Sequence, residues 1–253
     1  MDGVWLAALS GVIGGGTLLV GAAVAWFIDI PQRVVAGIMA LGAGVLISTL
    51  AFELVEEAAE VGGLIPTSVG FLVGALLYIV ADWLVSRPKA PRPSTPANIV
   101  ARRAGSRVAG GAGVAIAIGA LIDGIPESIV MGLSVLQGGI SIPIVAAIAI
   151  SNFPEGLGST AALKRSGSSG RRVALLWSSI AAVTVVAAVL GYVAFQSAPV
   201  GLIALITTIA AGGLLAMVCN TMIPEAFDEQ QALTGLYATI GFLAAFLLHE
   251  LAG

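Results

Sequence analysis

The sequence predicts an all-α polytopic membrane protein with eight transmembrane helices. Hydrophobic residues make up 58% of the chain, charged residues make up 10%, and the mean hydropathy is +1.05. These values lie far outside the range that is typical of soluble domains. Several apolar runs exceed the roughly 18 residues that identify a membrane span. In addition, the basic residues gather in alternate interruptions between those runs.

Pro, Gly and charged residues divide the chain into eight apolar segments. Because lipid offers the backbone no hydrogen bonds, we expect each segment to be a helix. The segments are 3–28, 34–58, 65–86, 108–136, 140–163, 173–196, 199–222 and 233–252. The first has no basic residue before it, so we expect a retained span and not a cleaved signal peptide. Together they predict one transmembrane domain over residues 1–253.

The basic residues give the expected orientation, because cytoplasmic connections collect Lys and Arg. All eleven lie in or beside the first, third and fifth connections between spans: Arg33, Arg87, Lys89, Arg92, Arg102, Arg103, Arg107, Lys164, Arg165, Arg171 and Arg172. This pattern predicts a cell-membrane protein with both termini outside. The proline-rich segment at about 87–107 is then a cytoplasmic loop.

Two short segments near span ends are similar to each other. They are "AFELVEEAAE" (51–60), in the second span, and "NTMIPEAFDE" (220–229), which ends the seventh. These spans run in opposite directions through the membrane. The similarity therefore predicts an inverted repeat, in which spans one to three and six to eight flank a central pair, giving a 3+2+3 bundle.

The fourth and fifth spans carry polar residues at mid-membrane depth. Asp123 and Glu127 are four residues apart and therefore lie one helical turn apart on one face, and Ser151 and Glu155 repeat this spacing. Asn152 lies beside them. Each span also contains a proline, which leaves one backbone carbonyl without its helical donor.

The three carboxylates of this central pair require compensation. A charged side chain at the bilayer centre costs at least about 2.5–3.5 kcal/mol. Neither span contains a Lys or Arg that could neutralise Asp123, Glu127 or Glu155. Bound cations, or protons that exchange with them, are the remaining candidates.

The motifs "DGIPES" and "SNFPEG" resemble the paired His-Asn-x-Pro-Glu-Gly motifs of the ZIP (Zrt/Irt-like) divalent metal-ion transporters. The segment "AFELVEEA" resembles the second helix of that family. The resemblance implies a metal site that contains Glu127, Glu155 and Asn152, and uptake of metal ions into the cytoplasm. Asp123 and Ser151 stand where the family often has histidine.

These replacements affect the expected ion. Carboxylate, amide and hydroxyl oxygens suit harder ions better than histidine nitrogen does, so manganese or iron competes with zinc as the substrate. Within the resemblance, a second metal would require a glutamate in the sixth span, and residues 176–192 contain no carboxylate. One metal site is therefore expected, with the ion as substrate and no cofactor.

Four glutamates form an acidic stripe at the outer end of the second span, at positions 53, 56, 57 and 60. They form either a solvated helix end or an entrance that collects cations, and we include Glu53, the deepest, among the candidate metal-site residues. His249, in the last span, is expected to lie at the membrane interface. All four tryptophans, among them Trp177, are expected to form an interfacial belt.

Two other functions are compatible with the sequence. The chain could be a metal-sensing or scaffold membrane protein of the same fold that does not transport. An intramembrane hydrolase with Ser159 as nucleophile would need a base, and the sole histidine is expected at the opposite membrane face. We therefore expect no enzymatic activity. No nucleic-acid partner is expected either. The expected partners are divalent ions and the lipid bilayer, and a homodimer is left open.

Overall fold

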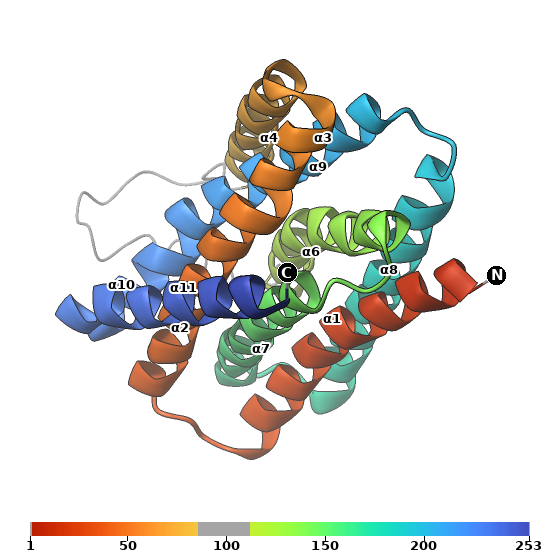
Figure 1. The fold of residues 1–253 in the computed structure, drawn as a ribbon. Coiled ribbons are helices and arrows are strands. Elements are labelled where there is room, and N and C mark those ends of the chain that lie inside the picture. Colours follow the sequence, from red (N-terminus) through yellow and green to blue (C-terminus); the bar gives the residue numbers. More distant parts are fainter. Residues whose placement is uncertain (1, 86–111, 253) are drawn as a thin grey trace.

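A computed structural model describes residues 2–85 and 112–252, and every regular element in these two ranges is helical (Figure 1). Eight helical spans among the described residues are long and apolar enough to cross a membrane. The elements are α1 (Asp2–Phe27), α2 (Gln32–Thr49), η1 (Leu50–Glu56), α3 (Glu57–Gly62), α4 (Leu64–Val85), α6 (Ala112–Gln137), α7 (Ile142–Arg165), α8 (Gly170–Phe195), α9 (Val200–Met217), η2 (Val218–Met222), α10 (Ile223–Gln230) and α11 (Ala232–Ala252). The predicted loop at 87–107 lies outside the described residues.

The second and seventh spans are longer than the sequence predicts. Each covers 31 residues, Gln32–Gly62 and Val200–Gln230, because the helix continues past its acidic residues. In both spans a π-helical segment, η1 or η2, separates two α-helical parts. Each span ends next to a residue with positive φ, Gly63 (86°) or Gln231 (49°). Left-handed backbone ends a helix more sharply than charge does.

Neighbouring ends show that α1 and α8 are antiparallel. Gly3, at the start of α1, lies against the Tyr192 side chain near the end of α8. Gly170, at the start of α8, lies against Trp26 near the end of α1. Helices that run in opposite directions meet in this way, as alternating membrane spans require.

Glycines allow two other pairs of helices to pack backbone to backbone. A Cβ on Gly44 of α2 would collide with the carbonyl oxygen of Ala238 in α11. A Cβ on Gly212 of α9 would collide with the carbonyl oxygen of Phe71 in α4. Small residues at such contacts are typical of membrane helix packing. Thus α2 pairs with α11, and α9 pairs with α4.

Helix bounds recur along the chain at a constant separation. The bounds of α8 lie 168 residues after those of α1, since Gly170 follows Asp2 and Phe195 follows Phe27 by that number. The bounds of α9 follow those of α2 by the same number. The starts of η2 and α11 follow the starts of η1 and α4 likewise. Residues 2–85 and the chain from 170 onward therefore share one order of helices without insertions.

The helices α6 and α7 lie in the middle of the bundle (Figure 1). α7 packs against α1 and α2, whereas α6 packs mainly against α8, and the two touch each other only slightly. A close approach of Gly21 in α1 to the carbonyl of Phe153 brings α7 against α1. The polar residues of α6 and α7 are therefore enclosed by apolar helices.

The position of Trp177 differs from the one predicted from the sequence. It was predicted to lie in an interfacial belt, yet it is 0% exposed, and its indole Nε1 donates a hydrogen bond of 2.7 Å to Thr160 Oγ1 of α7. It packs with Leu18, Leu163 and Ile180 in a core between α1, α7 and α8. Trp5 and Trp83, by contrast, are mostly exposed. A partner for the indole N–H allows full burial of a tryptophan.

Candidate metal centre

The α6 side of the candidate site consists of buried acidic residues. Asp123 is 6% exposed and Glu127 is 2% exposed, and they lie one turn apart. The helix continues through Pro126. Ser128 Oγ donates a hydrogen bond of 2.6 Å to the carbonyl of Gly124. Glu127 Oε2 is buried and accepts no hydrogen bond from any described residue.

The α7 side combines an amide, a hydroxyl and a carboxylate. Ser151 and Asn152 are buried, and Glu155 is half-buried. Ser151 Oγ donates to the carbonyl of Ile148 at 3.0 Å, so its lone pairs stay available to a cation. Asn152 Nδ2 donates to the carbonyl of Gly14 in α1 at 3.1 Å, which fixes the plane of the amide.

Side chains from both helices converge on Glu127. The Asn152 side chain is within hydrogen-bonding reach of its carboxyl group, and the carboxyl groups of Glu155 and Asp123 lie within electrostatic range. Four of the six predicted residues are thus brought to one region, and Ser151 adjoins Asn152 in α7. Both charged neighbours that act on Glu127 are acidic, which makes the region attractive to a cation.

Carboxylates alone do not form a metal site in this region. In the two described ranges, no three His, Cys, Asp or Glu side chains are grouped so that they could hold one metal ion. A cation here would need ligands of other kinds, and Asn152 and Ser151 offer oxygen atoms. Such mixed oxygen sites are typical of hard divalent ions.

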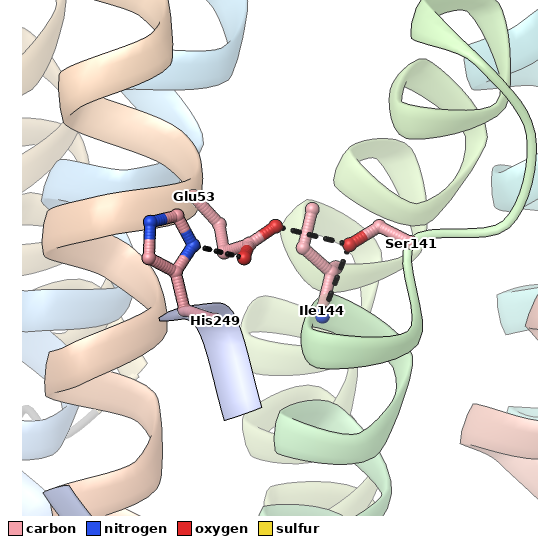
Figure 2. A network of polar contacts seen from close by, with 4 residues as sticks. All are labelled: Glu53, Ser141, Ile144 and His249. Carbon is pink, nitrogen blue, oxygen red and sulfur yellow. Dashed lines mark hydrogen bonds and ion pairs between the residues drawn. The ribbon is translucent and has the colours of Figure 1, made fainter. Parts of the chain in front are cut away.

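Glu53 lies apart from these residues. Its Oε2 accepts a hydrogen bond of 3.2 Å from Ser141 Oγ, and its Oε1 lies 2.6 Å from His249 Nδ1 (Figure 2). Ser141 precedes Glu155 by 14 residues along α7, which corresponds to about 21 Å at 1.5 Å per residue. The structure therefore does not bring Glu53 to the central carboxylates.

Contacts at the two ends of the bundle are distinct. The contacts of Glu53 lie where α11 ends and α7 begins, which we name the terminal end. At the opposite end, named the loop end, Lys164 pairs with Asp29 at 3.0 Å, and Gln230 donates to the carbonyl of Arg33. The central region lies between the two ends.

Sequence reasoning missed two partners of Glu53. His249 is 196 residues away in sequence, and Ser141 is 88 residues away. The expected position of His249 at the same membrane face as Glu53 was the only available signal. Nothing in the local sequence of Ser141 distinguished it from an ordinary helix cap.

The serine-hydrolase alternative gains no support from the geometry. Ser159 follows Ser141 by 18 residues in one helix, about 27 Å, whereas His249 lies close to Glu53, which contacts Ser141. The sole histidine therefore cannot serve Ser159 as a general base, which must lie within hydrogen-bonding reach.

No protein-family model matches the chain, and no curated protein matches it. Any function proposed for the chain therefore rests on its motifs and on the geometry of its own side chains.

Proposed function

We propose that the chain is a membrane carrier of divalent metal ions, with the substrate bound between α6 and α7. The observation that carries this proposal is the environment of Glu127. Its carboxyl group is 2% exposed, one of its oxygens accepts no hydrogen bond from the described residues, and the charged groups near it, Glu155 and Asp123, are acidic. A divalent cation would satisfy the orphaned oxygen and offset the repulsion among the three acids.

The proposed ligands are Asp123, Glu127, Ser151, Asn152 and Glu155. All of them offer oxygen atoms, so the site favours hard ions such as manganese or iron over zinc more than a histidine-bearing site does. No cofactor is proposed. The resemblance of the two Pro-Glu motifs to those of the ZIP family supports this function and an import direction, with both termini outside the cell membrane.

The constant separation of 168 residues supports a 3+2+3 inverted repeat. Under this proposal α1 to α4 and α8 to α11 are two copies with opposite orientation, and α6 with α7 lies between them. The antiparallel contact of α1 with α8 fits this arrangement. So does the pairing of α2 with α11 and of α9 with α4, because exchange of the two copies converts one pair into the other. Inverted repeats that surround a mid-membrane site are typical of secondary transporters.

Proteoliposomes test the proposal most simply. Vesicles that contain the purified chain and a metal-sensitive dye are mixed with Mn²⁺, Fe²⁺ or Zn²⁺ in turn, and vesicles without protein give the leak rate. We expect saturable entry of at least one ion. A metal sensor or scaffold would bind the ion in equilibrium dialysis but give only the leak rate, and that result would contradict transport.

A further inference from the structure

Three segments of the chain meet in one polar cluster at the terminal end (Figure 2). Glu53 comes from η1, Ser141 from the turn before α7, and His249 from the last helix, α11. The two carboxylate oxygens of Glu53 are divided between the other two side chains, Oε1 with His249 and Oε2 with Ser141. We name these three residues the terminal latch.

The two contacts of the terminal latch differ in length and in the packing that supports them. His249 approaches Glu53 to 2.6 Å, and its ring stacks on Phe52 with a centroid distance of 5.7 Å. Phe52 also packs against the rings of Phe242 and Phe246 in α11. The end of α11 is thus held on η1 by a set of aromatic contacts. Ser141 makes a single hydrogen bond of 3.2 Å to the carboxylate.

Ser141 links Glu53 to the helix that carries the central residues. It is the N-cap of α7, and its Oγ accepts a hydrogen bond of 3.3 Å from the backbone N–H of Ile144 while it donates to Glu53. Asn152 and Glu155 lie farther along the same helix. Release of Ser141 would therefore free the start of α7 from η1 without disturbing the aromatic contacts.

We propose that Glu53 is a gate residue that exchanges Ser141 for an arriving cation. The Ser141 contact closes the terminal end, while His249 holds the carboxylate in position. Glu53 is 15% exposed in its side chain, so a cation can reach it from solvent. A divalent ion binds carboxylate oxygen more strongly than a neutral hydroxyl donor does, so it displaces Ser141 from Oε2. The purpose of the gate rests on the proposed function, but its existence is testable in the absence of transport.

Spin-label distances in detergent or nanodiscs test the closed contact without metal. Cys219, which is exposed, is first replaced by alanine, and labels are attached at exposed positions 61 in α3 and 137 in α6. Ser141→Thr keeps both the helix cap and the hydroxyl donor. Ser141→Asp keeps the cap but cannot donate, and Ser141→Ala loses both.

In the parent and in Ser141→Thr we expect one short distance. In Ser141→Ala and Ser141→Asp we expect the ratio of a longer to the short distance to rise about tenfold, the usual effect of losing a hydrogen bond to a charged group. Parent-like distances in both of the latter variants would overturn the latch. An equal change in Ser141→Thr would overturn it too, because the donor would then be irrelevant.

Zn²⁺, which does not disturb spin labels, tests the exchange. Added to the parent, Zn²⁺ should raise the fraction of molecules that show the longer distance. Glu53→Gln should no longer respond to Zn²⁺. Glu229→Gln, at an exposed position on α10 near the loop end, is the matched control and should respond like the parent. An unchanged response in Glu53→Gln would overturn the exchange. A latch that opens in vesicles that show no metal flux would contradict the proposed function alone.

Discussion

Asn152 of α7 donates a hydrogen bond from Nδ2 to the backbone carbonyl of Gly14 in α1, at 3.1 Å. The asparagine is 3% exposed, so no water competes for the contact. On another side of Gly14, an added Cβ would lie 2.8 Å from Met131 Cε, so α6 also packs closely against α1 here. One amide group is therefore held by α1 beside Glu127, and α1 becomes part of the support of the proposed site.

The first prediction separates the structural role of Asn152 from its role as a ligand. Asn152→Asp keeps an oxygen and nearly the same volume but removes the N–H that reaches Gly14. We expect it to lose about 1–2 kcal/mol of unfolding free energy and still to gain thermal stability when Mn²⁺ is added. Asn152→Leu should lose both. Thermal unfolding in detergent measures both effects, and a full Mn²⁺ response in Asn152→Leu would show that the amide is no ligand.

The second prediction concerns ion preference. Asp123→His with Ser151→His introduces nitrogen ligands where the chain has oxygen, so the affinity for Zn²⁺ relative to Mn²⁺ should rise about tenfold or more. Competition between the two ions in titration calorimetry measures this ratio. If the parent already binds Zn²⁺ far more tightly and the double variant has the same ratio, Asp123 and Ser151 do not set the ion preference.

The third prediction concerns the paired glycines. Gly44→Ala and Gly212→Ala, 168 residues apart, should each lower stability by at least about 1–3 kcal/mol, because the added methyl group meets a backbone carbonyl. Gly16→Ala is the control. It has open space around its Cβ, and alanine favours a helix there by about 0.5–1 kcal/mol. Equal unfolding midpoints for all three variants would contradict both helix contacts.

The fourth prediction concerns the buried pair Trp177 and Thr160. Trp177→Phe leaves the Thr160 hydroxyl, which is 0% exposed, without its donor. Thr160→Val in turn strands the indole N–H. A double-mutant cycle on unfolding free energies should give a coupling of about 0.5–2 kcal/mol, the range found for hydrogen bonds between membrane helices. A coupling of zero would mean that the hydrogen bond makes no net contribution.

Much of the fold follows from the sequence because the bilayer imposes a strong constraint. Spans must be apolar and helical, so eight segments could be predicted, with ends that differ from the structure by a few residues. The exceptions are the second and seventh spans. Their acidic residues resemble helix ends, whereas the positive φ of Gly63 and Gln231 decides where those helices stop.

That the polar residues of α6 and α7 would gather in one region was predictable for a related reason. A carboxylate in an apolar run costs free energy in the bilayer, so it marks a candidate functional residue. Glu127 and Glu155 could be recognised in this way from the sequence alone. The partners of Glu53 were not predictable. His249 and Ser141 meet it only through packing of distant segments, and no local pattern encodes such contacts. The burial of Trp177 was not predicted, because no sequence pattern indicates that its indole N–H donates to Thr160 in the neighbouring helix.

Metal flux into liposomes for Glu127→Gln and Glu155→Gln shows whether the ion passes between α6 and α7. Each change keeps shape and volume but removes a carboxylate, so flux should fall to the leak rate while the helical content and thermal stability of the folded protein persist. Glu229→Gln, exposed on α10, is the matched control and should transport like the parent. Parent-like flux in both central variants at neutral pH would show that the ion does not pass between α6 and α7.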